Sequence, residues 1–137
     1  MYSAQSTFSR MSIAFSVLVF LPCSAFAGND ACTVLSAAKF SEIAGYKVDV
    51  NKQASNDTVC MYKGAGNAVG GILMIIDEAA TPRKLEMVNQ QGSVPQGKSG
   101  KLGATFSKGT IVFSVGMIGT DPSRVNALAA EVKRNLK

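Results

Sequence analysis

The sequence has 137 residues, a net charge of +5, three Cys, and neither Trp nor His. The absence of histidine excludes a Ser-His-Asp triad, a Cys-His pair and a histidine-ligated zinc site, because each needs an imidazole to carry a proton or bind the metal. Most familiar hydrolase and metalloenzyme classes are therefore excluded, and we expect no cofactor.

The N-terminus has the pattern of a cleavable signal peptide. A polar lead ends at Arg10, an apolar run covers 13–21, and small residues precede a cleavage point after Ala27. The run is shorter than the roughly 20 residues that span a bilayer, and Pro22 interrupts it. We expect cleavage between Ala27 and Gly28, which removes residues 1–27. The product is a single domain of residues 28–137 without a transmembrane segment, located in the periplasm or secreted.

Cleavage also removes Cys23 and leaves Cys32 and Cys60 as an even pair. In an exported protein such a pair favours a disulfide. The alternative is a redox pair, but the spacing is unlike Cys-x-x-Cys. We therefore predict a structural disulfide between Cys32 and Cys60.

The first half of the domain predicts one helix and three strands. Ser36 can cap a short helix that Gly45 ends. Alternating residues at 46–50 and strand formers at 58–62 predict an antiparallel pair. The next strand, 69–77, has a continuous apolar core, which is typical of a strand in the middle of a sheet.

The second half predicts a helix, a hairpin and a final helix. Thr81 and Pro82 begin a helix that stops before Gly92. The loop Gly92–Gly100 has no periodicity, and we expect it to be the longest mobile loop. Alternation at 102–106 and 111–117, around a tight turn, predicts the hairpin.

The final helix begins at Asp121-Pro122. Its apolar residues recur at helical spacing and predict a buried stripe of Val125, Leu128, Ala129, Val132 and Leu136. The same pattern places Arg124, Glu131, Lys133, Arg134 and Lys137 outward. The order α-β-β-β-α-β-β-α predicts an α+β fold, with an antiparallel sheet of about five strands and helices on one face.

The segment Ala31–Ala38 resembles the opening Cys-x-Leu-Leu-Thr-x-Ala-Glu of many small exported bacterial proteins and lipoproteins, most of them uncharacterised. The similarity extends to Gly45, to Cys60 on an early strand, and to the Ala-Leu-Ala core at 127–129. Lys39 departs from the glutamate that those proteins have at its position. The resemblance implies a compact envelope protein of α/β make-up and carries no catalytic residues.

Ser36 and Lys39 match the Ser-x-x-Lys pattern of penicillin-binding proteins and serine β-lactamases. Those enzymes need a larger chain and further elements that are missing here. We expect Ser36 to cap the helix, and we keep a small serine-dependent cell-envelope hydrolase as an alternative.

Two other groupings do not predict a site. The glycines around 64–71 precede a strand, whereas a phosphate-binding loop opens a helix. Asp77-Glu78, Asp49 and Asp57 lack the spacing of a calcium loop, so we expect no metal.

Three lysines near the predicted loop and hairpin, Lys98, Lys101 and Lys108, form a candidate binding face. The alternative is that surface lysines only aid solubility. Export, small size, a single disulfide and the lack of catalytic groupings favour a non-enzymatic macromolecule-binding module of inhibitor, immunity or accessory type. Its partner would be an acidic protein or an anionic envelope component rather than nucleic acid, since few aromatics are available. A further alternative is a small-ligand carrier that holds an apolar molecule on the sheet face opposite the helices.

Overall fold

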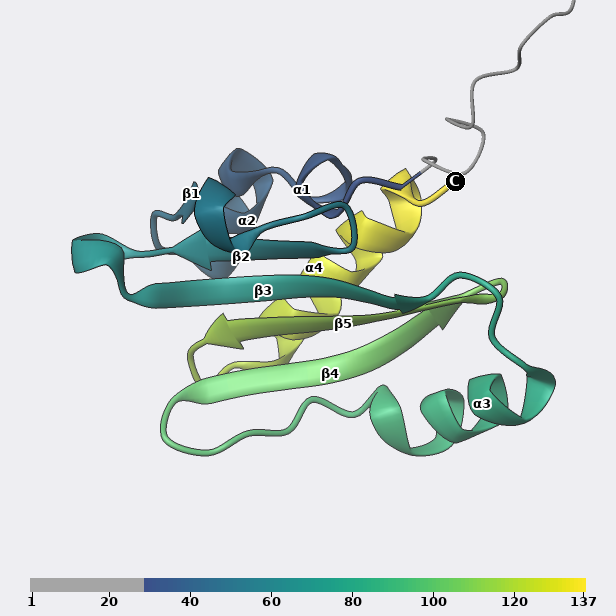
Figure 1. The fold of residues 1–137 in the computed structure, drawn as a ribbon. Coiled ribbons are helices and arrows are strands. Elements are labelled where there is room, and N and C mark those ends of the chain that lie inside the picture. The colour runs from purple at the N-terminus through teal and green to yellow at the C-terminus, as the bar shows by residue number, and fades with distance from the viewer. Residues whose placement is uncertain (1–28) are drawn as a thin grey trace, which may run out of the picture.

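The computed structural model describes residues 29–137 of the chain. The predicted signal peptide, with its cleavage point between Ala27 and Gly28, lies outside this range. The described residues form an α+β fold around one antiparallel sheet, which confirms the predicted class (Figure 1). The strand order is β1-β2-β3-β5-β4, where the strands are β1 (Asp49–Val50), β2 (Val59–Lys63), β3 (Val69–Asp77), β4 (Lys101–Lys108) and β5 (Ile111–Ile118).

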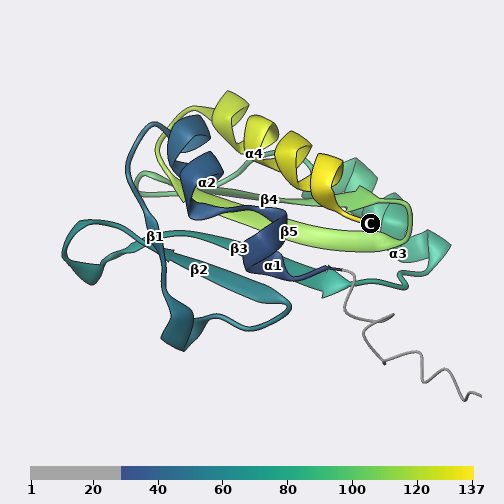
Figure 2. The same cartoon turned by 90° about the horizontal axis from the view of Figure 1, so that it is seen from above.

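Three helices cover one face of the sheet (Figure 2). They are α1 (Ala31–Val34), α2 (Ala37–Ala44) and α4 (Pro122–Asn135). Ser36 caps α2 as predicted, because its hydroxyl accepts from the backbone N–H of Lys39, and Gly45 ends the helix in the left-handed conformation. The predicted stripe of α4 is buried against the sheet.

The main core lies between these helices and the sheet. Phe40 of α2 stacks on Tyr62 of β2, with ring centroids 4.4 Å apart. The same ring lies against Gly71 of β3, where an added Cβ would come 2.1 Å from Phe40 Cζ. Glycine is therefore required at position 71 by the close approach of the helix.

The helix α3 (Pro82–Met87) packs outside this main core. With the π-helical turn Val88–Gly92 it lies beside β4 (Figure 1). A second small cluster joins Ala80 and Val88 to Val112, with Leu85 against it. The neighbouring Phe113 faces the main core, and adjacent strand residues point to opposite faces. This helix therefore covers one end of the sheet face that the other three leave uncovered.

The disulfide between Cys32 and Cys60 is present, with the two Cα atoms 4.9 Å apart, and it ties α1 to β2. The short helix α1 was not predicted from the sequence. The side chain of Asp30 caps it by accepting from the backbone N–H of Cys32. Among residues 29–137, no helix combines the length and apolar character needed to cross a membrane.

Two expectations are wrong in detail. The predicted strand 46–50 is paired only at Asp49–Val50, and just before it the backbone N–H of Val48 donates to the hydroxyl of Ser41 in α2 instead of to a strand. Glu131, expected to point outward, is only 8% exposed. Its carboxylate accepts from Arg134 at 2.7 Å and from the amide of Asn135 at 3.1 Å. These partners compensate the burial of its charge.

Candidate binding surface

The sheet face opposite α1, α2 and α4 is largely uncovered, and we call it the open face. Side chains alternate along each strand, so β2, β3 and β5 each send every second residue to this face. Several of these residues are large and apolar. Ile76 is 44% exposed, Ile118 43% and Met74 38%, and Val69, which lies at a register shift between β2 and β3, is 58% exposed and lines a groove together with Ile118. Because scattered apolar residues are normal but contiguous ones mark interaction sites, this face is the strongest candidate for binding.

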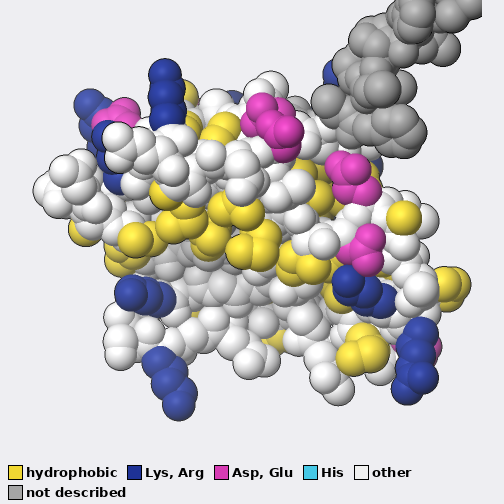
Figure 3. Space-filling view, in the orientation of Figure 1, with side chains coloured by type: hydrophobic (Ala, Val, Ile, Leu, Met, Phe, Trp, Pro, Cys, Tyr) yellow, Lys and Arg dark blue, Asp and Glu magenta, His cyan; other side chains and the backbone are white. Residues whose placement is uncertain are grey.

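The open face has a ridge and a trough. The ridge consists of Ile72, Met74 and Ile76, which follow one another along β3. The trough lies on β5 and β4, where Gly116 and Gly103 are directly opposite each other and Ser114 is the next residue on the same face. Figure 3 shows a band of hydrophobic side chains across this side of the molecule, with an area of backbone and polar or small side chains beside it.

At one end of the open face the trough deepens into an apolar groove of about 200 Å³. Gly116 lines the groove with backbone atoms only, and a Cβ at this position would come 3.0 Å from Cγ2 of Ile72. Its one charged lining residue is Lys101. The lining residues are Val69, Gly71, Ile72, Lys101, Leu102, Gly116, Met117 and Ile118.

Loops pair with part of the backbone near each edge of the sheet. On the β4 side, Gln96 and Gly103 exchange two backbone hydrogen bonds of 2.9 Å. On the β2 side, the loop after β1 supplies partners, since the carbonyl of Met61 accepts from Asn51 and its N–H donates to Ser55. A ligand that adds a strand needs free edge groups. These contacts shorten the free part of each edge, whereas the open face is exposed over most of its length.

The structure brings together two of the three lysines of the predicted binding face. Lys101 lines the groove, and its N–H donates to the carbonyl of Lys98 in the preceding loop. Lys108 lies at the other end of β4, about 23 Å away at the usual rise per strand residue. Its ammonium donates to the carbonyls of Lys133 and Leu136, the latter at 2.9 Å. Lys108 therefore stabilises the end of α4, where cations are favoured by the helix dipole.

Ser36 and Lys39 lie at the start of α2, away from the open face. The hydroxyl of Ser36 accepts from the backbone N–H of Lys39 at 3.2 Å. The ammonium of Lys39 instead pairs with Glu42 at 3.3 Å. In this arrangement the lysine stabilises a helical turn and does not contact the serine hydroxyl.

The carboxylates at the end of β3 are held apart by different partners. The carboxylate of Asp77 accepts from the N–H of Ala79 and from Lys84 at 3.0 Å, and these hydrogen bonds lower the pKa of Asp77. Glu78 accepts from the side chain of Asn29. Each carboxylate is thus used in the fold.

Comparison of the sequence with protein-family models and with curated proteins finds no match. The open face must be interpreted from its own chemistry. Its ridge was visible in the sequence as the continuous apolar run of β3. The trough was not recognised, because glycine and serine in a strand do not indicate which residues face each other across the sheet.

Proposed function

We propose that this protein is a non-enzymatic binding module that binds an acidic macromolecule through its open face. The observation that carries the proposal is an exposed apolar ridge beside a groove whose single charged lining residue is Lys101. Signal-peptide cleavage after Ala27 and a periplasmic or secreted location complete the proposal. The Cys32–Cys60 disulfide supports them, because such bonds persist in oxidising compartments.

The size of the groove favours a macromolecule over a free small ligand. Pockets that enclose small molecules have volumes of about 300–1,000 Å³, and this apolar groove has about 200 Å³. That volume suits one or two apolar side chains of a partner, of the kind that anchor protein interfaces. The surrounding ridge then supplies contact area, and Lys98 and Lys101 attract carboxylates on the partner.

The test is affinity capture from envelope extract with the disulfide-bonded protein and two variants. Ile118→Thr changes the groove, and Met87→Thr is the matched control. Met87 is 59% exposed on α3, outside the open face. We expect one stoichiometric acidic protein to bind the native chain and the control, and to be lost from Ile118→Thr.

A charge variant tests the acidic character of the partner. Lys101→Gln is preferable to changing all three lysines, because Lys108 is used by α4. We expect Lys101→Gln to weaken capture at low salt more than at high salt, since screening already removes much of the attraction at high salt. A partner retained equally by Ile118→Thr and Met87→Thr would place binding elsewhere on the molecule.

A further inference from the structure

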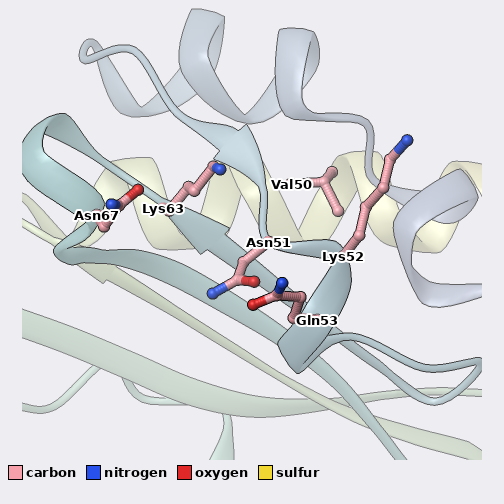
Figure 4. A pocket seen from close by; sticks show the side chains of 6 residues that line it. All are labelled: Val50, Asn51, Lys52, Gln53, Lys63 and Asn67. Atoms are coloured by element: carbon pink, nitrogen blue, oxygen red, sulfur yellow. The ribbon is translucent and has the colours of Figure 1, made fainter.

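A polar pocket of about 580 Å³ lies beside the β1–β2 edge of the sheet. Figure 4 shows Lys63 and Asn67 on one side, Val50, Lys52 and Gln53 on the other, and Asn51 between them. One wall therefore comes from the end of β2 and the turn after it, and the other from β1 and the 3-10 turn Lys52–Ala54.

The pocket walls carry hydrogen-bonding groups that the fold does not use. Within residues 29–137, no hydrogen bond or ion pair of the structure engages the side chains of Lys52, Gln53, Lys63 or Asn67. The Oδ1 atom of Asn51 accepts from the N–H of Ala54 at 3.3 Å, which leaves the amide NH₂ of Asn51 as a donor. Each of the five polar side chains thus has at least one group available to a ligand.

The charge of the pocket is positive. It is lined by two lysines and no carboxylate. Asp49 is the cross-strand partner of Lys63, yet the two side chains form no ion pair within 4 Å. The Lys63 ammonium extends into the space between Asn67 and Val50 (Figure 4). An anionic group placed there would find a cation without having to displace a carboxylate.

The backbone fixes one wall. Asn67 has a φ of 62° and follows Gly66 with a φ of 67°. Non-glycine residues seldom adopt this left-handed conformation, although asparagine does so more readily than most. Consecutive left-handed residues turn the chain sharply at the end of β2 and place the Asn67 amide at the rim of the pocket.

We propose that this pocket binds an anionic saccharide, meaning a sugar that carries a carboxylate or a phosphate. The carboxamides of Gln53 and Asn67 can both donate to and accept from sugar hydroxyls, and that of Asn51 can donate, while Lys63 recognises the anionic substituent as a point charge. The volume exceeds what a bare anion needs and falls within the range of small-ligand pockets. This site is separate from the open face, and the proposal does not depend on macromolecule docking there.

The experiment is a titration of the isotope-labelled, disulfide-bonded protein followed by ¹⁵N–¹H NMR. The probes are a galacturonate trimer, glucose 6-phosphate, maltotriose and inorganic phosphate. We expect one or both anionic sugars to shift the amide signals of residues 50–54 and 63–67. Binding by the galacturonate trimer alone assigns a carboxylated sugar, and binding by glucose 6-phosphate alone assigns a phosphorylated one.

The neutral sugar and the bare anion are the probes that can refute the two halves of the proposal. Maltotriose binding as tightly as the anionic sugars would show that the lysines play no part. Phosphate binding as tightly as glucose 6-phosphate, with no response to galacturonate, would show an anion site without sugar recognition. No shift with either anionic sugar at millimolar concentration would overturn the proposal entirely.

Variants locate the binding. Lys63→Gln should weaken the bound anionic sugar by about fivefold, the upper effect of an exposed ion pair. Arg83→Gln is the matched control, because Arg83 is an exposed cation on α3 outside the pocket, and its loss should leave the affinity unchanged. Equal losses in the two variants would indicate general charge attraction and would contradict a site at Lys63.

Discussion

The two faces of the sheet are both apolar, but only one is covered by helices over most of its length. On the helix-covered face Leu73, Phe113 and Val115 are completely buried. On the open face Met74 and Ile76, which are neighbours of these residues in the same sheet, remain 38% and 44% exposed. The buried core therefore explains the apolar residues on one face of β3, and those on the other face need a separate explanation.

A strand that is apolar on both sides is usually covered on both sides. Here α3 covers only the end near Val112, and the rest of the second face is open. Exposed apolar side chains add little to stability and favour aggregation, and their presence on one contiguous face is the basis of the proposed binding function. The covered face thus holds the residues that maintain the fold, and the open face holds those that are available for binding.

The largest effect is expected from the covered face. Leu73→Ala removes a fully buried side chain at the centre of the sheet. The lost burial and the cavity should lower the free energy of unfolding by about 3–5 kcal/mol. Urea unfolding followed by circular dichroism measures this. A loss under 1 kcal/mol would mean that the covered face is not the energetic core.

The disulfide gives the next largest effect. Replacing Cys32 and Cys60 together by serine opens a loop whose ends are 28 positions apart. In the chain-entropy model this costs about 3.5 kcal/mol, which is a large part of the stability of a small domain. The double variant and the native protein should differ by this amount in urea, whereas adding a reductant to the variant should change nothing.

The sequence predicted the covered face better than the open one. The Ser36 cap, the Gly45 stop and the stripe of α4 follow from local spacing, and the structure confirms them. The continuous apolar run at 72–76 correctly predicted a central strand. Local spacing cannot show which face of that strand stays uncovered, since this depends on where distant helices pack.

The features that the sequence did not reveal share one physical origin, which is that they depend on how distant residues are placed by the fold. Lys108 was grouped with Lys98 and Lys101 because they are near in sequence, yet an eight-residue strand carries it to the end of α4. The trough requires Gly103 and Gly116 to face each other, which is a matter of register. The polar pocket combines residues from β1, β2 and two turns, none of which forms a recognisable motif by itself.

A smaller effect is expected at Tyr62, where the hydrogen bond of the hydroxyl and the burial of the phenol both contribute. The pH dependence of stability reports on the burial. Its hydroxyl donates to the carbonyl of Leu35 inside the covered core, and burial raises its pKa. Tyr62→Phe leaves that carbonyl without its partner and should cost about 1–2 kcal/mol at pH 8.

The sign of the pH dependence follows from linkage. The folded pKa of Tyr62 lies above the unfolded value of about 10, so its contribution is complete below pH 10 and declines as pH rises toward the folded pKa. The native protein should therefore lose stability more steeply than Tyr62→Phe as the pH rises above about 10. Parallel curves for the two proteins would contradict the buried phenol.

The smallest effect is expected on the open face, and it is the sharpest test of the comparison. Met74→Thr with Ile76→Thr keeps good strand formers on the ridge while removing apolar surface that is already partly in water. The free energy of unfolding should change by no more than about 1 kcal/mol, or about 0.5 kcal/mol for each surface substitution. In the same double variant, binding of an apolar dye and capture of the proposed partner should both decrease. A destabilisation approaching that of Leu73→Ala would mean that the ridge contributes to the fold itself. In that event its exposure would no longer be an argument for a partner, and the open face would have to be understood as a second, incompletely covered core.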